Sequence, residues 1–509
     1  MKRRLFLTHA GTAALGAATP FSVRAQTRPL LGSGLRGTRN ALEFGVAPDT
    51  DIDQTAAFQA MLETVAAEGN ALFLPGGIYV LAGIELPDGL LIEGIPGRTR
   101  LVHAGTGPLL SASQATAITL RGLSVDAAGR PADGDQGLLE LRDTTGFTAE
   151  ECSFENAGVA AIHLERSSAA LMRNSVTDAS GVAIFGRDSE GLRIDGNTVR
   201  RCANGGILVY RSEPGRDGAV ITGNSISEIG AANGGTGQWG NGINLFRADD
   251  TIVANNVISG SAFSAIRGNT VRNMQVTGNV CRDSGETAIY AEFAFANALI
   301  SDNIVEGAAN GISAPNLDHG GHGATISGNI VRNLHADGPY DPGFPGFGTG
   351  IGVEADAVVT GNLVESAPLY GINAGWGPFL RDVVVASNTI RDARIGIGVS
   401  AADGAGRALI RGNLIAARET GIQAHAWAKA VAPDLLTGPA AEPDIAGNDT
   451  LPHPATKALA GQHLIERCGG FGAALMVDKA VQIEVVPHIA SGRHRDRRML
   501  EVLGQPEKL

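Results

Sequence analysis

Asparagine recurs in one fixed local frame through most of the chain. Each of these asparagines has an apolar residue three positions before it and another two positions after it. Successive copies lie 23 to 33 residues apart, a period typical of solenoids in which each repeat forms one coil. The repeated residues are Asn174, Asn197, Asn224, Asn256, Asn279, Asn303, Asn329, Asn362, Asn388 and Asn413. An amide at the same turn of every coil predicts an internal ladder of stacked side chains, so we interpret these residues as structural.

Short runs of β-branched residues surround the asparagines, and no stretch of helical periodicity separates them. This pattern disfavours a leucine-rich repeat. In the same coils a small residue is followed by Ile and then by alternation, and Ile243, Ile266, Ile289 and Ile312 are each 23 residues apart. The two motifs predict an all-β fold: a right-handed parallel β-helix, which is a solenoid of three-strand coils.

A capping helix is predicted before the first coils. Asp53 is a good N-cap, and Phe58, Met61, Leu62 and Val65 follow at the spacing of one apolar helix face. A solenoid needs such a cover, because its first coil would otherwise expose its core and a bare sheet edge.

This N-terminal run, FG…D…TAAFQAML…FLPGGIYVL within residues 43–95, resembles the start of the pectate-lyase-like β-helix superfamily, which includes rhamnogalacturonase-type enzymes. The body, residues 80–430, resembles the twin-arginine-exported β-helix repeat proteins, a family without an assigned activity. The resemblance implies a fold and a compartment, and it supplies no active-site motif.

The first residues carry an export address. Arg3 and Arg4 precede a weakly apolar stretch at 11–21, and Val23-Arg24-Ala25 forms a small-residue cleavage site. We expect export by the twin-arginine machinery to the periplasm or the cell exterior; a Sec signal or a buried helix is the alternative. The expected organisation is a signal peptide at 1–25, a cap with the first coils at 26–95, a β-helix at 96–445 and a tail at 446–509.

Charge and cysteine content limit the partners. Forty basic and 52 acidic side chains give a net charge of −12, which disfavours binding to nucleic acid or to an anionic membrane. No span in the mature protein is apolar enough to cross a membrane. The cysteines have no zinc spacing and are expected to be small buried residues, with a Cys152–Cys202 disulfide as the alternative: Cys152, Cys202, Cys281 and Cys468. We expect no cofactor and no metal, and a polysaccharide or oligosaccharide as partner.

Strand alternation places the residue after each Ile on the outer surface. This outward column contains Leu208, Asn244, Arg267, Tyr290, Ser313, Gly352, Asn373, Gly398 and Gln423. Two residues further along each strand lies a second column with Tyr210, Phe246, Asn269, Glu292, Pro315, Glu354, Gly375, Ser400 and His425. Coils about 4.8 Å apart make Arg267 and Tyr290 neighbours.

Two inserts, at 229–241 and 334–349, emerge beside these columns. We expect them to form the walls of a cleft over Arg267 and Tyr290, because long loops on a rigid scaffold often carry function. Aromatic residues of the inserts are suited to stacking on sugar rings: Trp239, Tyr340 and Phe344. The alternative is that the loops only shield the sheet.

The leading interpretation is a lyase or epimerase acting on uronic-acid polymers. Arg267 would bind a uronate carboxylate as a bidentate fork, and its charge would lower the pKa of Tyr290 so that the phenolate acts as the base. Glu292 and His322 complete the candidate catalytic group. The candidate substrate-binding residues are Trp239, Asn244, Arg247, His319, Tyr340, Glu354, Asn373 and Trp376.

Two other functions remain open. Glu292 and Glu354 share a column two coils apart, about 9.6 Å between backbones, near the carboxylate separation of inverting glycosidases. The chain is also consistent with a non-catalytic solenoid that binds a glycan or a protein, in which case the outward columns are an ordinary solvated face.

Overall fold

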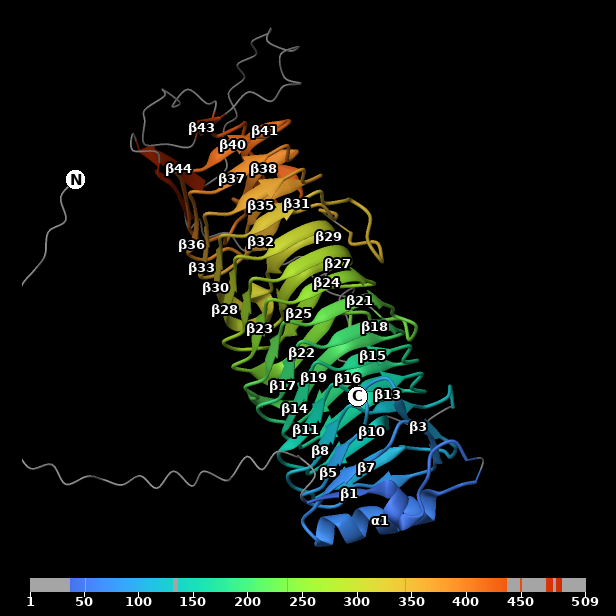
Figure 1. Cartoon of the computed structure of the whole chain (residues 1–509). Helices are drawn as coiled ribbons and strands as arrows, with labels where there is room; N and C mark the ends of the chain where they lie inside the picture. The colour runs from blue at the N-terminus through green and yellow to red at the C-terminus, as the bar shows by residue number, and fades with distance from the viewer. Residues whose placement is uncertain are drawn as a thin grey trace, which may run out of the picture.

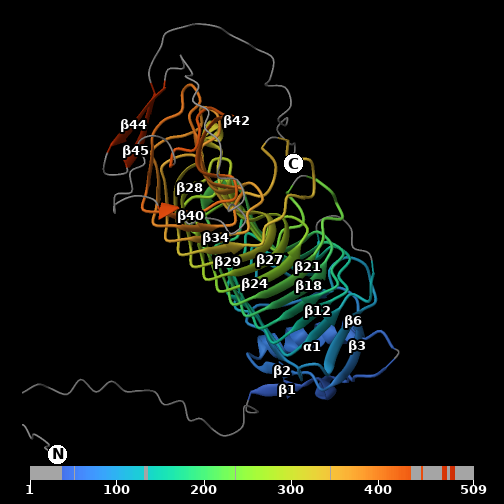
Figure 2. The same cartoon turned by 90° about the horizontal axis from the view of Figure 1, so that it is seen from above.

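The protein is a long solenoid in the computed structural model, which describes residues 37–50, 52–130, 136–235, 237–343, 345–436, 449–450, 473–478 and 482–487. The coils stack from the N-terminal helix at one end to the last strands at the other (Figures 1 and 2). The predicted all-β right-handed parallel β-helix is confirmed. The predicted signal peptide, Cys468 and Phe344 lie outside the described residues.

Each coil contributes one strand to each of three faces. Face one holds the strands that precede the repeated asparagines, paired in parallel from coil to coil within a 17-stranded sheet. Its parallel strands are β1 (Thr38–Asn40), β2 (Ala71–Phe73), β5 (Leu91–Glu93), β8 (Thr119–Arg121), β11 (Phe147–Glu150), β14 (Ala169–Met172), β17 (Arg193–Asp195), β20 (Val220–Thr222), β23 (Ile252–Ala254), β26 (Gln275–Thr277), β28 (Ala296–Ser301), β30 (His322–Ser327), β33 (Ala357–Thr360), β36 (Val383–Ala386) and β39 (Ala408–Arg411).

Face two holds the strands that follow the asparagines. They are β3 (Gly77–Leu81), β6 (Thr99–His103), β9 (Ser124–Asp126), β12 (Ser153–Glu155), β15 (Ser175–Thr177), β18 (Thr198–Cys202), β21 (Ser225–Ile229), β24 (Val257–Ser261), β27 (Val280–Glu292), β29 (Ile304–Ala314), β31 (Ile330–Arg332), β34 (Leu363–Glu365), β37 (Thr389–Arg391), β40 (Leu414–Ala416) and β43 (Asp449–Thr450).

Face three holds the strands of the Ile motif. They are β4 (Ile84–Glu85), β7 (Leu110–Ser113), β10 (Gly137–Arg142), β13 (Ala160–Glu165), β16 (Val182–Arg187), β19 (Gly205–Arg216), β22 (Ile243–Asp249), β25 (Ile266–Asn269), the second halves of β27 and β29, β32 (Ile351–Val353), β35 (Tyr370–Ala374), β38 (Ile395–Ser400) and β41 (Thr420–Ala426). Because β27 and β29 run through both faces, faces two and three form one 28-stranded sheet.

The predicted asparagine ladder is present along its whole length. From Asn174 to Asn413, each side-chain Nδ2 donates to the Oδ1 of the next asparagine at 2.9–3.0 Å. The residue before each asparagine has a left-handed backbone, as at Gly223 (φ 66°) and Gly278 (φ 67°). Glycine adopts this conformation without strain, which explains the recurrent Gly-Asn pair.

The ends of the solenoid are covered differently. At the N-terminal end, η1 (Ala41–Phe44) precedes α1 (Thr55–Ala67), which buries the four predicted apolar residues. The helix begins after Gln54, and the predicted cap Asp53 instead accepts a bond from the backbone N–H of Thr55 at 2.9 Å. At the other end β42 (Lys429–Ala430) pairs with β41, and a hairpin of β44 (Ala473–Asp478) and β45 (Gln482–Pro487) pairs antiparallel with β39.

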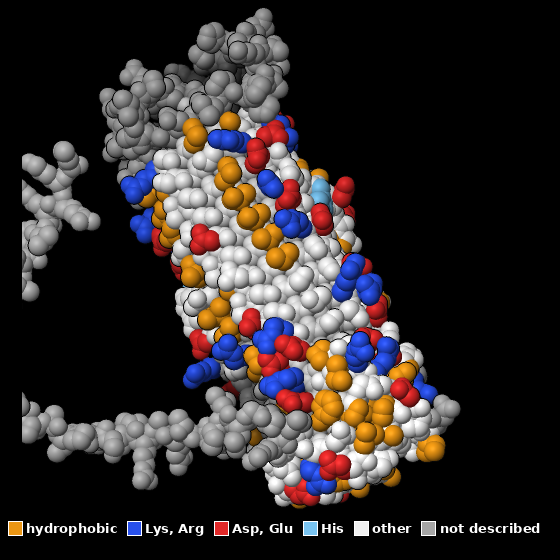
Figure 3. Space-filling model, viewed as in Figure 1, with side chains coloured by type: hydrophobic (Ala, Val, Ile, Leu, Met, Phe, Trp, Pro, Cys, Tyr) orange, Lys and Arg blue, Asp and Glu red, His pale blue; other side chains and the backbone are white. Residues whose placement is uncertain are grey.

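Surface charges are mixed in sign. Basic and acidic side chains intermingle over the face shown in Figure 3 and form no extended basic patch there. Within the described residues no helix is both long and apolar enough to cross a lipid bilayer. Cys152, Cys202 and Cys281 are free and buried, so the alternative Cys152–Cys202 disulfide is not formed.

Candidate functional site

Arg267 and Tyr290 are paired neighbours on β25 and β27, as the register predicted. Asn269 and Glu292 pair in the same way two residues further on. The guanidinium of Arg267 forms an ion pair with Glu292 and donates to the carbonyl oxygen of Gly237 at 2.6 Å. Only 11% of the Arg267 side chain and 7% of the Glu292 side chain are exposed. This arginine is therefore already engaged and does not present an open fork for a uronate.

The prediction that Arg267 lowers the pKa of Tyr290 enough for the phenolate to act as a base is wrong. Burial raises the pKa of Tyr290 well above its usual value of 10.0, and the nearby carboxylates of Glu292 and Glu286 raise it further. The charge of Arg267 acts in the predicted, lowering direction, but it is the smallest of these effects. Tyr290 is consequently a neutral phenol near neutral pH rather than a ready base.

The two inserts cover this surface instead of walling a cleft above it. The hydroxyl of Tyr340, from the second insert, donates to Oε1 of Glu286 at 2.5 Å, and its ring stacks on Phe263 with centroids 6.3 Å apart. In the first insert the carbonyl of Gln238 accepts a bond from Asn244 at 3.2 Å. Over Arg267 and Tyr290 the two inserts therefore shield the sheet, which was the alternative to a cleft.

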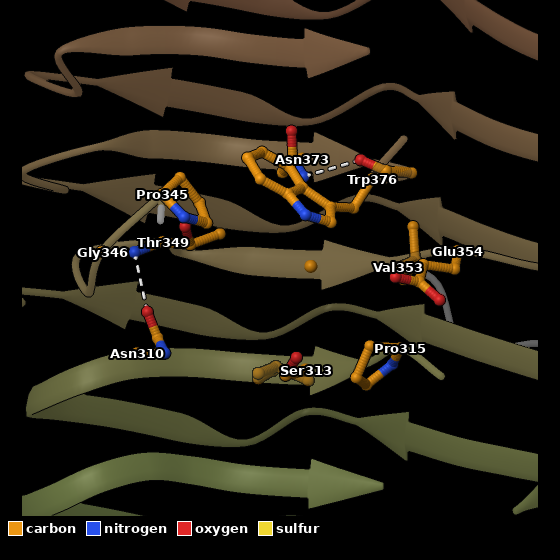
Figure 4. A pocket seen from close by; sticks show the side chains of 13 residues that line it. Asn310, Ser313, Pro315, Pro345, Gly346, Thr349, Val353, Glu354, Asn373 and Trp376 are labelled. Atoms are coloured by element: carbon orange, nitrogen blue, oxygen red, sulfur yellow. Dashed lines mark hydrogen bonds between the residues drawn. The ribbon is translucent and has the colours of Figure 1, made fainter. Parts of the chain in front are cut away.

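An open groove lies beside the second insert, between strands that precede it and strands that follow it. Its floor consists of Ser313, Gly352 and Asn373, which are register partners on β29, β32 and β35. Pro345, Gly346 and Thr349 of the second insert line one side, and Pro315, Glu354 and Trp376 line the other (Figure 4). Two outward positions predicted from the sequence, Asn373 and Glu354, therefore do share a site with the candidate Trp376.

A buried histidine supports the floor and the side of this groove. Nε2 of His425 lies 2.9 Å from Oδ1 of Asn373, whose Nδ2 donates to the carbonyl of Gly375 at 3.0 Å. The imidazole packs against Trp376 with ring centroids 5.7 Å apart. Burial lowers the pKa of His425 to about 4, so it stays neutral near pH 7 and fixes Asn373 and Trp376 in place.

Glu354 supplies the groove with its acidic group. Its Oε2 accepts a bond from the backbone N–H of Leu317 at 2.8 Å. The pKa of Glu354 is raised to about 7, mainly by burial. The neighbouring charge of Asp318 also raises this pKa, whereas the bond from Leu317 and the neighbouring His319 lower it. A carboxyl group that titrates near neutral pH is suited to exchanging a proton with a bound molecule.

A family comparison matches the same coils. The sequence profile described as "Right handed beta helix region" matches residues 116–235 and 214–380, more than half of the chain. The chain belongs to the right-handed β-helix family.

Solved structures share this fold at low identity. The N-terminal fragment of gene product 12 of bacteriophage Phi29 has a TM-score of 0.51 and 14% identity, over 76% of this chain and 68% of that one. The surface adhesin PfbA of Streptococcus pneumoniae has a TM-score of 0.43 and 10% identity, over 89% of this chain and 100% of the adhesin. The A-module of a mannuronan C-5 epimerase of Azotobacter vinelandii has a TM-score of 0.32 and 14% identity, over 76% and 95%. No curated protein matches the sequence significantly.

The remaining candidate residues of this β-helix lie apart from the groove. Arg247 donates to the carbonyl of Ser212 at 2.5 Å and covers the ring of Phe246. His322 begins β30 on face one, where its Nδ1 lies 2.8 Å from the carbonyl of Gly320. Trp239 is half-buried in the first insert. These three residues do not meet Glu354.

Glu292 and Glu354, the alternative carboxylate pair for an inverting glycosidase, do not face one shared site. Glu354 lines the groove, whereas Glu292 is not among the residues that line it and is occupied by Arg267 and Asn269. Sequence reasoning missed Glu286 and the positioning role of His425. His425 was visible in the second outward column of the β-helix, three coils from Glu354, but its contact with Asn373 has no signal in the sequence.

Proposed function

We propose that this β-helix binds a polysaccharide through the groove over β29, β32 and β35. The observation that carries the proposal is the combination of an open polar floor with a fixed aromatic ring at its side. Ser313 and Asn373 offer hydrogen-bonding groups on the floor, and Trp376 offers a flat apolar surface. Sugar rings have hydroxyl edges and apolar faces, and this arrangement complements both.

The charge of the groove favours neutral sugars over uronates. Among the described residues that line it, Glu354 alone carries a charge, and that charge is negative when the group ionises. A uronate would meet a carboxylate there instead of the cation that β-elimination needs. The geometry consequently gives less support to a uronate lyase or epimerase than to recognition of a neutral or N-acetylated glycan.

Isothermal titration with matched oligosaccharides tests this proposal. Cello-, xylo- and chito-oligosaccharides are compared with oligogalacturonates and oligomannuronates, whose cleavage by a lyase would also appear as ultraviolet absorbance. We expect saturable binding of at least one neutral series and a loss of about five- to tenfold in affinity for Trp376→Ala. Trp239→Ala is the matched control, because this tryptophan lies in the first insert. Binding of uronates alone, or of no sugar, would refute the proposal.

Hydrolysis is a second candidate function, favoured by the titration of Glu354. Its pKa of about 7 keeps the group largely protonated at slightly acid pH, as a general acid requires. Asp318 is exposed nearby and is the candidate for the second carboxylate that most glycosidases use. New reducing ends released by the wild type but not by Glu354→Gln, with binding retained, would establish this activity. Turnover that survives the substitution would exclude this role.

The export route is proposed from the leader alone. Arg3 and Arg4 and the stretch behind them support delivery of the folded protein by the twin-arginine machinery to the periplasm or exterior. A leader fusion to a reporter should be exported, and an Arg3→Lys, Arg4→Lys leader should not. Export of both leaders alike would point to the Sec route.

A further inference from the structure

One position in the floor of the groove has no side chain. Gly352 on β32 lies between its register partners Ser313 on β29 and Asn373 on β35. A β-carbon on Gly352 would meet only two atoms within 4 Å, the Ser313 hydroxyl oxygen at 3.5 Å and the Thr349 methyl carbon at 3.9 Å. A hollow one side chain deep therefore separates Ser313 from Asn373, which lie on opposite sides of the intervening strand (Figure 4).

The hollow ends at Asn373. The next outward position is Gly398, where a β-carbon would lie 2.8 Å from the ring of Tyr370, so that position is covered. Oδ1 of Asn373 would lie 2.5 Å from the same β-carbon and faces Nε2 of His425. The amide oxygen of Asn373 is thus turned away from the hollow, and its amide nitrogen lies on the side of Gly352.

The two polar side chains beside the hollow have unused hydrogen-bonding capacity. Nδ2 of Asn373 donates one N–H to the carbonyl of Gly375 at 3.0 Å, and nothing in the described part of the chain accepts the second. The hydroxyl of Ser313 lines the groove and has no hydrogen-bond partner among the described residues. A hydroxyl both donates and accepts, whereas an amide nitrogen only donates. The hollow therefore has an acceptor on one side and a donor on the other.

An acetamido group complements this arrangement. A secondary amide carries its N–H and its C=O on opposite sides, so the N–H can donate to Ser313 while the C=O accepts from Asn373. Two hydrogen bonds with one amide between them span about 8 Å, and the backbones of Ser313 and Asn373 are about 9.6 Å apart. The methyl groups of the acetamido and of Thr349 can meet beside Pro345. A plain sugar hydroxyl would leave the hollow unfilled.

We infer that the hollow over Gly352 binds the acetamido group of an N-acetylhexosamine, so that the groove selects N-acetylated amino-sugar polymers over unsubstituted glycans. Gly352 determines this specificity by leaving the space, and Ser313 and Asn373 recognise the two ends of the amide. The inference rests on the proposed function, which it narrows from neutral or N-acetylated glycans to one substrate class.

Titration of the full-length protein with chitotetraose and cellotetraose tests the inference, because the two sugars differ only in the acetamido or hydroxyl group at C2. We expect the wild type to bind chitotetraose about tenfold or more tightly than cellotetraose. Gly352→Ala fills the hollow with a β-carbon whose contacts of 3.5 Å and 3.9 Å are ordinary, so the fold is kept, as thermal unfolding verifies. In this variant the preference for chitotetraose should fall to within about twofold.

Two further variants complete the test. Ser313→Ala adds no atoms and removes the acceptor for the acetamido N–H, so it should lower the preference for chitotetraose several-fold. Gly215→Ala is the matched control, because a β-carbon on this glycine of β19 would meet only Arg211, at 3.7 Å, away from the groove. It should keep the preference of the wild type.

The other outcomes separate this inference from the proposed function. If cellotetraose or xylotetraose binds the wild type as tightly as chitotetraose, the acetamido site is overturned and the groove stands. A preference for chitotetraose that survives in both Gly352→Ala and Ser313→Ala would equally overturn the hollow as its cause. If none of these sugars binds the wild type, the proposed function fails and this inference fails with it.

Discussion

At the scale of single residues, the asparagine ladder shows how one side chain satisfies several buried groups. Oδ1 of Asn279 accepts bonds from the backbone N–H and from Nδ2 of Asn256, both at 3.0 Å, and its Nδ2 donates to Val253 at 2.9 Å and to Asn303 at 3.0 Å. Every rung is buried, so a lost amide leaves donors that water does not reach.

Replacing Asn279 by Ala should therefore destabilise the protein by about 3 kcal/mol or more, at about 1–3 kcal/mol for each orphaned group. The measurement is the denaturant midpoint of unfolding. Asn233→Ala, at an exposed asparagine of the first insert, should change it by less than about 0.5 kcal/mol. Equal effects of the two substitutions would contradict a structural ladder.

The buried carboxylate of Asp217 should make the stability of the protein depend on pH. Its carboxylate oxygens are buried without a hydrogen-bond partner, and burial raises its pKa to about 7. A folded pKa above the unfolded value of about 3.9 means that the stability contributed by this group is full below about pH 4 and is lost as pH rises from there through about 7. Asp217→Asn should gain on the wild type by about 2.5 kcal/mol between pH 5 and pH 8.

Thermal unfolding of the wild type and of Asp217→Asn across this pH range measures the effect. Asp403→Asn, at an exposed aspartate, is the control and should follow the wild type. A wild-type stability that rises relative to Asp217→Asn from pH 5 to pH 8 would have the wrong sign and would reject the account.

Residue chemistry was the part of the site least predictable from the sequence. The register placed Arg267 beside Tyr290 correctly, because side-chain direction alternates along a strand. The pKa of Tyr290 was misjudged, because it depends on how deeply the phenol is buried and on the charge of Glu286, whose carboxylate Tyr340 contacts. Tyr340 and Glu286 both lie outside the outward columns, so no repeat in the sequence predicts the contact between them.

At the scale of elements, the strands were predictable and the inserts were not. Strand positions repeat in every coil, and each repeat confirms the others. The second insert occurs once and has no such repetition. The sequence therefore indicated where the insert leaves the coil but not which residues it contacts. It folds back to Glu286 through Tyr340 and also lines the groove through Thr349.

Tyr340→Phe tests this coupling between the shielded surface and the groove. The ring and its stacking on Phe263 remain, while the bond to Glu286 is lost and leaves that buried carboxyl without its phenol partner. We expect faster amide hydrogen exchange in residues 334–349 and a few-fold weaker sugar binding, because the insert forms one side of the groove. Unchanged exchange in this segment would show that the contact does not hold the insert.

At the scale of the whole molecule, the solenoid provides a long, rigid surface with one open stretch. Face three is shielded by the two inserts around Arg267 and becomes open from Ser313 to Trp376. The repeats predicted the scaffold, and the apolar spacing from Phe58 to Val65 predicted the capping helix. The location of the opening was not predicted, because it depends on which outward positions the inserts leave uncovered.

A crystal structure of the protein soaked with cello-, xylo- and chito-hexasaccharide in turn tests the central claim most directly. The account predicts sugar density over Ser313, Gly352 and Asn373, with one ring against Trp376. Density over Arg267 and Tyr290 between the two inserts, or the absence of bound sugar at saturating concentration in solution and in the crystal, would contradict it.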